Sequence, residues 1–242
     1  MAKTNGQPDV LEFLPDLTSK KKKGVHKPIY AKVFTKDIVE GDTAKVIHMM
    51  INPYSGKKKG NKIAALAKSM FEERSIKVET HLSSYSGELI ELTSKLTTNE
   101  ADIIVVVGGD GSLSEVVTGL MQSQKTCRIG LIPAGTGNSM ANDLKITSTE
   151  DAVTRICNGH YQALDLAKVD MVAGLPGHEN GELTRYSINL VTWGLGVDST
   201  IKAEKMRWMG PMRYDVGILM AIMANNRRNA TLTIDGNTIE DD

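Results

Sequence analysis

Hydrophobic and polar positions follow two alternating patterns through the first two thirds of the chain. Strand-like runs occupy residues 46–51 (VIHMMI), 77–82 (KVETHL), 102–107 (DIIVVV) and 127–134 (CRIGLIPA). Segments that read as helices follow them, at residues 62–75, 87–97, 112–121 and, after a loop, within 135–144. Strands that alternate with helices pair in parallel, so the pattern predicts an α/β fold whose sheet is covered by helices on both faces.

The pattern changes after a further helix predicted at residues 149–160. Residues 162–173 and 183–197 are rich in β-branched and apolar residues, and residues 230–239 (ATLTIDGNTI) contain an Asp-Gly hairpin turn. We therefore expect an N-terminal extension at 1–44, an α/β domain at 45–162 and a partial, β-rich domain at 163–242. Because the chain stops just after a hairpin begins, we expect a fragment of a longer protein or a β-domain completed by another chain, as in a homo-oligomer.

Composition and charge exclude several classes of protein. Lys and Arg total 29 and Asp and Glu total 29, so no global field favours nucleic acid. Cys127 and Cys157 form no CxxC or His-containing cluster, so neither a disulfide framework nor a metal site is predicted, and a reduced, cytoplasmic setting follows. The N-terminus lacks the pattern of a secretory signal, and the apolar run at residues 216–224 is shorter than the roughly 20 residues of a membrane span.

Three glycine-containing loops each follow a predicted strand and precede a predicted helix. They are NPYSGKKKG (52–60), GGDGS (108–112) and PAGTGN (133–138). Glycine lets backbone N–H groups approach an anion, and the start of the next helix adds a positive dipole end. Because the carboxyl ends of parallel strands form the ligand-binding edge of an open sheet, the loops predict a polyphosphate site. Taken separately, each such loop is more often an ordinary turn than a binding site.

Asp110 stands within the second glycine loop, where its carboxylate would repel phosphate unless it acts on another group. A hydroxyl to be deprotonated and a bound Mg²⁺ are the two groups that suit it. The alternative is a tight turn in which Asp110 caps a helix.

Taken together, the three loops resemble the diacylglycerol kinase catalytic domain family, which includes sphingosine and ceramide kinases, over residues 45–236. The resemblance implies a three-layer, phosphofructokinase-like or NAD kinase-like nucleotide-binding domain followed by a β-sandwich that helps to house a lipid. It also implies that Asp110 accepts the proton of the lipid hydroxyl. The residues it implies at the nucleotide are Asn52, Ser83 or Ser84, Gly109, Gly111, Glu115 (as a brace), Gly135, Thr136 and Gly137.

A second segment, EKMRWMGPMRYD (204–215), looks like the stretch of sphingosine and ceramide kinases whose arginines reach the nucleotide phosphates. The resemblance assigns Arg207 and Arg213 to that role, with Gly210 and Pro211 breaking the helix between them. It also implies an acidic contact to the lipid headgroup near Asp198.

The sequence therefore predicts a lipid kinase that transfers the γ-phosphoryl group of ATP, with Mg²⁺, to a primary hydroxyl of a sphingoid base, ceramide or diacylglycerol. Such a substrate implies peripheral association with membranes, and no nucleic-acid partner is expected. Two alternatives stay open: an NAD kinase-like enzyme, and a nucleotide-binding module without catalysis.

Overall fold

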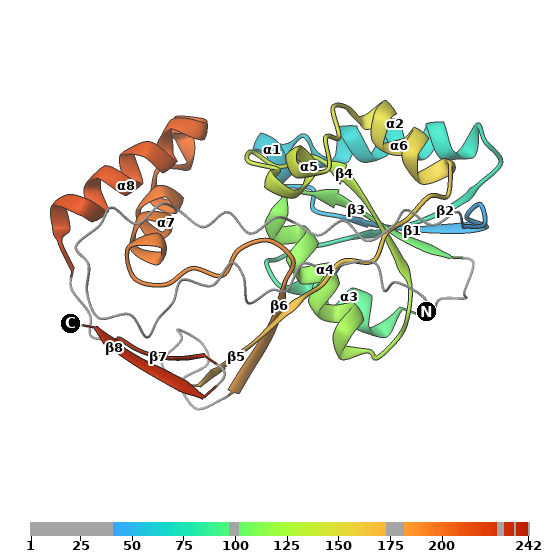
Figure 1. Ribbon diagram of the computed structural model, residues 1–242. Coiled ribbons are helices and arrows are strands. Elements are labelled where there is room, and N and C mark those ends of the chain that lie inside the picture. Colours follow the sequence, from blue (N-terminus) through green and yellow to red (C-terminus); the bar gives the residue numbers. More distant parts are fainter. Residues whose placement is uncertain (1–40, 97–101, 173–181, 227–229, 235, 242) are drawn as a thin grey trace, which may run out of the picture.

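The computed structural model describes residues 41–96, 102–172, 182–226, 230–234 and 236–241. Most of the predicted extension, residues 1–40, lies outside this range. At its centre is a four-stranded parallel sheet with the strand order β2-β1-β3-β4 (Figure 1). Its strands are β1 (Val46–Ile51), β2 (Lys77–Leu82), β3 (Ile103–Gly108) and β4 (Arg128–Pro133). The predicted α/β class and its four strands are confirmed.

Helices cover both faces of the sheet and complete the three layers (Figure 1). One face carries α2 (Gly60–Glu72) and α6 (Thr149–Cys157), and the other carries α3 (Glu88–Lys95) and α4 (Asp110–Gln122). Two short helices, α1 (Ser55–Lys58) and α5 (Ser139–Asp143), lie within the loops that follow β1 and β4. Each βα unit predicted from the hydrophobic pattern is therefore present.

Side chains of β1 and β3 alternate between two hydrophobic cores, as the pleat of a strand requires. Ile47 and Met49 of β1 pack with Phe71 of α2 on one face. Met50 and Val106 pack with α4 on the other face. Strand β3 is buried along its whole length, so the apolar run that follows Asp102 is explained by helices on both sides.

Smaller elements follow the sheet along the chain (Figure 1). Strands β5 (Ala167–Val172) and β6 (Glu182–Ser187) form one antiparallel pair, and β7 (Ala230–Ile234) and β8 (Asn237–Asp241) form another. Between the pairs lie α7 (Leu195–Lys205), the 3₁₀ segment η2 (Arg207–Met212) and α8 (Arg213–Ala224). In Figure 1, α7 and α8 stand side by side, away from the sheet and its helices.

The strand expected at residues 183–197 is shorter than the sequence pattern suggests. Strand β6 ends at Ser187, and α7 begins at Leu195. Gly194, just before the helix, has a φ of 62°, a left-handed value that favours glycine. Leu190, Val191 and Trp193 in between are exposed, so their apolar character does not indicate a buried strand.

Within the described residues, no helix is long and apolar enough to cross a membrane. The apolar run 216–224, which is the most hydrophobic segment of the sequence, belongs to α8.

Candidate active site

The three glycine loops meet at the carboxyl edge of the sheet because the strands before them lie side by side. Gly108 pairs with Pro133 in the register of β3 and β4, and the Ala134 amide donates to the Gly108 carbonyl at 2.8 Å. The Asn52 amide donates to the Val107 carbonyl at 3.1 Å. The ends of β1, β3 and β4 are thereby tied together before the loops diverge.

Glycine is required where the loops touch one another. A Cβ on Gly135 would lie 2.5 Å from the Gly109 Cα, and one on Gly56 would lie 2.3 Å from the Ala134 carbonyl oxygen. Such distances leave no room for a side chain. At Gly56 and Gly135 the structure therefore shows a reason for glycine that needs no ligand, and a Cβ on Gly109 would make a tight contact, 3.1 Å from the Gly135 Cα.

Other glycine-loop positions face open space. A Cβ on Gly111 would meet no heavy atom within 4 Å, and one on Gly137 would lie 3.7 Å from its nearest neighbour, an Asp110 carboxylate oxygen. Gly111, Thr136 and Gly137 are all exposed. Backbone at these positions is accessible to a ligand, which distinguishes them from the glycines that pack loop against loop.

Asn52 joins the first loop to the second. The side-chain Nδ2 of Asn52 donates to the Ser112 hydroxyl at 3.2 Å, and the side-chain Oδ1 of Asn52 accepts from the backbone N–H of Tyr54 at 3.0 Å. Ser112 is buried at the start of α4 and was not singled out from the sequence. Asn52 and the GGDGS loop are thus held as one unit.

Ser83 lies one strand further out, after β2. Its amide donates to the Ile51 carbonyl at 3.0 Å, and its hydroxyl is 3.4 Å from the same oxygen. The hydroxyl is buried and turned toward backbone, whereas Ser84 is exposed. A hollow of about 390 Å³ adjoins both serines, and it is lined by Pro53, Tyr54, Lys58, Asn61, Leu82, Ser83 and Ser84.

Asp110 is the first residue of α4, and its carboxylate caps a different helix. One oxygen accepts from the Ser139 amide and the other from the Met140 amide, both at 3.0 Å. These amides begin α5, so the carboxylate also interacts favourably with that helix dipole. A carboxylate has about four acceptor positions, and these two bonds leave the others for a further partner.

Asn138 shapes the third loop from within. Its side chain accepts from the Gly135 amide at 2.8 Å and donates to the Gly135 carbonyl at 3.0 Å. The residue has a φ of 53°, which asparagine tolerates better than most residues. The PAGTGN loop is therefore closed on itself while Thr136 and Gly137 stay exposed.

Glu115, predicted as a brace, links α4 to the start of α3. Its carboxylate accepts from the Gly87 amide at 3.0 Å. Burial raises the pKa of Glu115 above its ordinary value, and the backbone N–H groups of Gly87 and Leu89 oppose that rise. Gly87 has a φ of 94°, so the turn that presents its amide to Glu115 needs glycine.

A cavity of about 280 Å³ opens beside Asp110. One wall comes from α4 and α5, and the other comes from the segment that follows β6. This segment reaches α4 because the Ser114 hydroxyl donates to the Tyr186 carbonyl and the Tyr186 amide donates to the Thr118 hydroxyl, each at 3.2 Å. The lining residues are Asp110, Leu113, Ser114, Ser139, Met140, Ser187, Ile188, Asn189 and Leu190.

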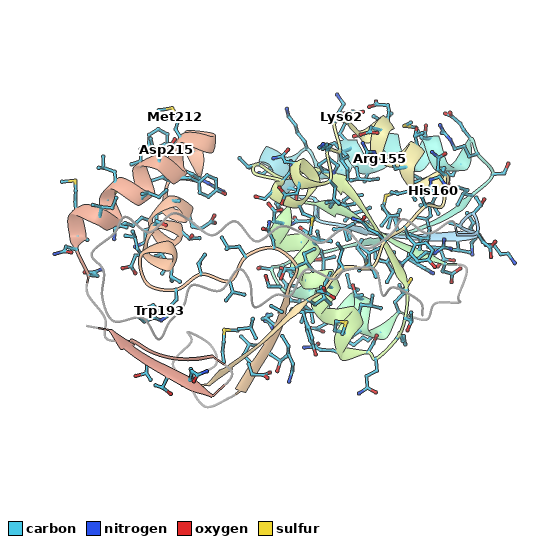
Figure 2. All side chains as sticks on the ribbon, viewed as in Figure 1. Lys62, Arg155, His160, Trp193, Met212 and Asp215 are labelled. Atoms are coloured by element: carbon cyan, nitrogen blue, oxygen red, sulfur yellow. The ribbon has the colours of Figure 1, made fainter. Side chains whose placement is uncertain are left out.

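Two side chains of α7 and α8 carry predictions, Arg213 at the nucleotide phosphates and Asp198 at the lipid headgroup, and both make contacts within their own part of the chain. The Arg213 guanidinium is buried, 3.4 Å from a Glu204 carboxylate oxygen, and donates to the Tyr214 hydroxyl at 2.7 Å. Asp198 is also buried, and its carboxylate accepts a hydrogen bond from the side-chain Nδ2 of Asn226 at 3.2 Å. Figure 2 labels Met212 and Asp215, which flank Arg213 in the chain, on the α7–α8 pair and away from the sheet.

The structure therefore does not bring Arg213 to the glycine loops, and Asp198 does not line the cavity beside Asp110. Gly210 has a φ of 64°, so the chain does turn sharply at the predicted break between Arg207 and Arg213. The turn brings Arg213 back beside Glu204 of α7, which is its acidic neighbour. Arg207 begins η2, and its side chain lies outside what the structure describes.

A parallel sheet with ligand-accessible glycine loops at the carboxyl ends of its strands is the arrangement of nucleotide-binding α/β proteins. The sequence profile of the diacylglycerol kinase catalytic domain matches residues 46–169, and the chain belongs to this family. The resemblance noted from the three loops is thereby confirmed.

Curated relatives include lipid kinases from distant organisms. The chain is 32% identical over 206 residues to Sphingosine kinase 1 of Arabidopsis thaliana, covering 81% of this chain and 41% of that protein. It is 29% identical over 219 residues to Ceramide kinase of Mus musculus, covering 82% of this chain and 40% of that protein. The chain thus spans about two fifths of the length of these relatives.

Solved structures carry the same fold. The crystal structure of a diacylglycerol kinase from Bacillus anthracis str. Sterne superposes with a TM-score of 0.53 at 19% identity, covering 84% of this chain and 62% of that one. At this level of identity the comparison confirms the fold and leaves the chemistry to the residues themselves.

Proposed function

We propose that this chain forms the nucleotide-binding and phosphoryl-transfer part of an ATP-dependent lipid kinase. The observation that carries the proposal is the position of Asp110. It lies where the glycine loops after β3 and β4 meet, and it also lines the cavity walled by α4, α5 and residues 187–190. One carboxylate thus adjoins both a phosphate-binding edge and a space for an acceptor.

The nucleotide is assigned to the exposed backbone of the loops. Gly111, Thr136 and Gly137 offer room for phosphate oxygens beside backbone N–H groups. Gly109 and Gly135 hold the two loops together, Asn52 fixes the first loop against α4, and Glu115 and Ser83 support the neighbouring loop. In this assignment only Gly111, Thr136 and Gly137 contact phosphate, and the other residues hold the loops in position.

Asp110 would act on the acceptor hydroxyl. As the hydroxyl oxygen bonds to the γ-phosphorus, its proton passes to a free lone pair of the Asp110 carboxylate, the bond from that phosphorus to the β–γ bridging oxygen breaks, and ADP leaves. Bonds from Ser139 and Met140 hold the carboxylate in place, which serves catalysis by positioning. Mg²⁺ fits this site, because it commonly binds through one or two carboxylates together with substrate phosphates, and would supply charge neutralisation.

The acceptor is assigned to a lipid with a primary hydroxyl, namely a sphingoid base, a ceramide or a diacylglycerol. One support is that the relatives include a sphingosine kinase and a ceramide kinase. The other is that apolar side chains line the cavity, namely Leu113, Met140, Ile188 and Leu190. We propose that residues 45–162 bind the nucleotide and that residues 163–242 contribute to the lipid site. A lipid substrate would bring the protein to membrane surfaces, and homo-oligomerisation stays a proposal.

An assay of radiolabelled phosphate transfer from [γ-³²P]ATP tests this function. Sphingosine, ceramide, diacylglycerol and NAD are offered separately, and thin-layer chromatography separates the products. We expect a labelled lipid and no labelled NADP. Labelled NADP without labelled lipid would favour the NAD kinase alternative, and nucleotide binding with no product would favour a non-catalytic module.

The Asp110→Asn variant separates the chemical role of this residue from its capping role. Asparagine keeps one oxygen for an α5 amide but cannot take the proton, so we expect turnover to fall by about 10²–10⁴-fold with ATP affinity nearly unchanged. Asp143→Asn, at the exposed end of α5, is the matched control. Turnover within tenfold of the parent protein would remove Asp110 from the role of base.

A further inference from the structure

A cluster of two histidines and a glutamate lies on the sheet, remote from the glycine loops. His48 is the third residue of β1, and Glu79 and His81 belong to β2. The parallel register sets His48 opposite Glu79 and Met50 opposite His81. Side chains two residues apart on a strand share a face, so the three side chains gather on one side of the sheet.

Geometry within the cluster suits metal ligands. One potential ligand atom from each of His48, Glu79 and His81 lies within 4.8 Å of the other two. The His48 Nδ1 atom is 3.4 Å from a Glu79 carboxylate oxygen, a separation close to that of two ligands on one tetrahedral zinc ion. The two imidazole rings have centroids 5.8 Å apart.

Buried histidine nitrogens supply an independent observation. His48 is 5% exposed. Among the residues that the structure describes, neither ring nitrogen of His48 and not the Nε2 atom of His81 has a hydrogen-bond partner. A buried polar atom without a partner costs free energy, so a native structure normally supplies one. A metal ion bound between the two rings would supply that partner to one nitrogen of each.

Asp102 lies on the side of the His48 ring that faces away from Glu79. Its carboxylate oxygen is 3.5 Å from the other ring nitrogen of His48, Nε2, and the residue is buried just before β3. Histidine ligands commonly direct their second nitrogen toward a carboxylate, which fixes the ring and its tautomer. On the outer side, Lys77 holds the second oxygen of Glu79 at 2.5 Å, leaving the first turned toward His48.

We propose that His48, Glu79 and His81 bind one Zn²⁺ ion, with Asp102 as the residue that orients His48. Two imidazoles and a carboxylate are ligands that zinc accepts, and a water would complete a tetrahedron. His48 lies four residues before Asn52, about 13 Å along the strand, so the ion would take no part in phosphoryl transfer. Its role would be structural, because it clamps the edge strand β2 to β1.

Sequence spacing gave no sign of this site. The histidines are 33 positions apart, without the short spacing of a zinc motif, and no metal site was expected. Only the register of β1 against β2 brings them together.

The test uses the full chain without a polyhistidine tag, stripped with a chelator and free of nucleotide. Zinc is titrated by calorimetry, and Co²⁺ serves as a spectroscopic probe of tetrahedral ligands. We expect one Zn²⁺ per chain, visible Co²⁺ absorption bands, and a melting temperature raised by about 5–10 °C at a zinc concentration 100 times Kd.

Variants localise the ion. We expect Glu79→Gln and His81→Gln, at partly exposed positions that tolerate substitution better than buried His48, each to weaken zinc binding by at least about tenfold and to abolish the Co²⁺ bands. His160→Gln is the matched control, because His160 is exposed after α6 (Figure 2). The proposal is wrong if the parent chain binds neither ion stoichiometrically, or if both cluster variants bind zinc as the control does.

Discussion

The sheet region and the α7–α8 pair differ in how they use apolar side chains. In α4 the apolar residues Leu113, Val116 and Val117 are buried against the sheet. In α8 the large apolar residues are mostly exposed, with Met223 at 77%, whereas the buried positions are Arg213, Gly217 and Ala221. Small residues let α7 and α8 approach closely, with a Cβ on Gly217 falling 2.6 Å from the Ser199 carbonyl oxygen.

This difference shows where the fold is self-contained. The sheet region covers most of its apolar surface with its own helices, and Tyr186 and Ile188 pack on one of its two cores. Its glycine loops are fixed by contacts within that region, whereas one wall of the cavity beside Asp110 comes from residues 187–190. The α7–α8 pair and the η2 segment between the two helices expose large apolar side chains, among them Trp208 of η2 at 80%, and such exposure is typical of contact with protein or lipid. Trp193, labelled in Figure 2 on the segment leading into α7, is likewise 61% exposed.

Matched truncations in the two regions give the largest expected difference in stability. Phe71→Ala empties a fully buried position of the first core and is expected to cost about 3–5 kcal/mol of unfolding free energy. Met223→Ala removes an exposed side chain and is expected to stay within about 0.5 kcal/mol. Urea unfolding followed by circular dichroism measures both, and similar losses for the two variants would contradict the contrast.

Gly111→Ala sharpens the comparison at the loop edge, with a smaller expected effect. The added Cβ enters open space at the start of α4, so the fold should gain up to about 1 kcal/mol of helix propensity. The same methyl group would occupy the proposed phosphate position, and we expect ATP affinity to fall by about tenfold. Thermal unfolding and calorimetric ATP titration are measured together, and unchanged affinity would place the phosphates elsewhere.

Gly109→Ala is the informative comparison for that variant. Its Cβ would lie 3.1 Å from the Gly135 Cα, so the methyl group presses on protein rather than on a ligand. We expect lower stability from this substitution, even with no nucleotide present. Equal behaviour of the two alanine variants would contradict the distinction between glycines that pack the loops and glycines that face the ligand.

Glu115→Gln has the smallest expected effect, and it depends on pH. Because burial raises the folded-state pKa of Glu115, the folded protein binds the proton more tightly than the unfolded chain does. Stability from this group is therefore present below its unfolded pKa and is lost as pH rises through the folded pKa. Glutamine stays neutral at both pH values and can accept the hydrogen bond of the Gly87 amide. The stability of the variant relative to the parent should therefore rise as the pH is raised from 4 to 7. Thermal melts at both pH values measure this, and an opposite trend would contradict the direction.

The sequence predicted the strands of the sheet more accurately than the exposed segment that follows β6. The bounds of β1 and β2 match the predicted strands, because each run is followed by a break of Asn-Pro or Ser-Ser. The strand at 183–197 was overextended because exposed apolar residues, such as Val191 and Leu195, look like buried ones in a hydrophobicity pattern. Apolar periodicity therefore served best where helices cover the sheet.

Site prediction was limited by contacts between distant residues. The convergence of three glycine loops follows from parallel strand order, which the alternating pattern implied. The capping of α5 by Asp110 joins residues 29 and 30 positions apart and depends on the register of β3 and β4. Likewise, sequence alone gave no reason to place residues 187–190 beside Asp110.

Hydrogen–deuterium exchange with and without MgATP reports on all three glycine loops in one experiment. If one nucleotide binds to the three loops, exchange becomes slower at residues 52–60, 108–112 and 134–139 together, with α7 and α8 unchanged. Protection confined to a single loop, or protection of α7 and α8 with none at the loops, would contradict a shared nucleotide site.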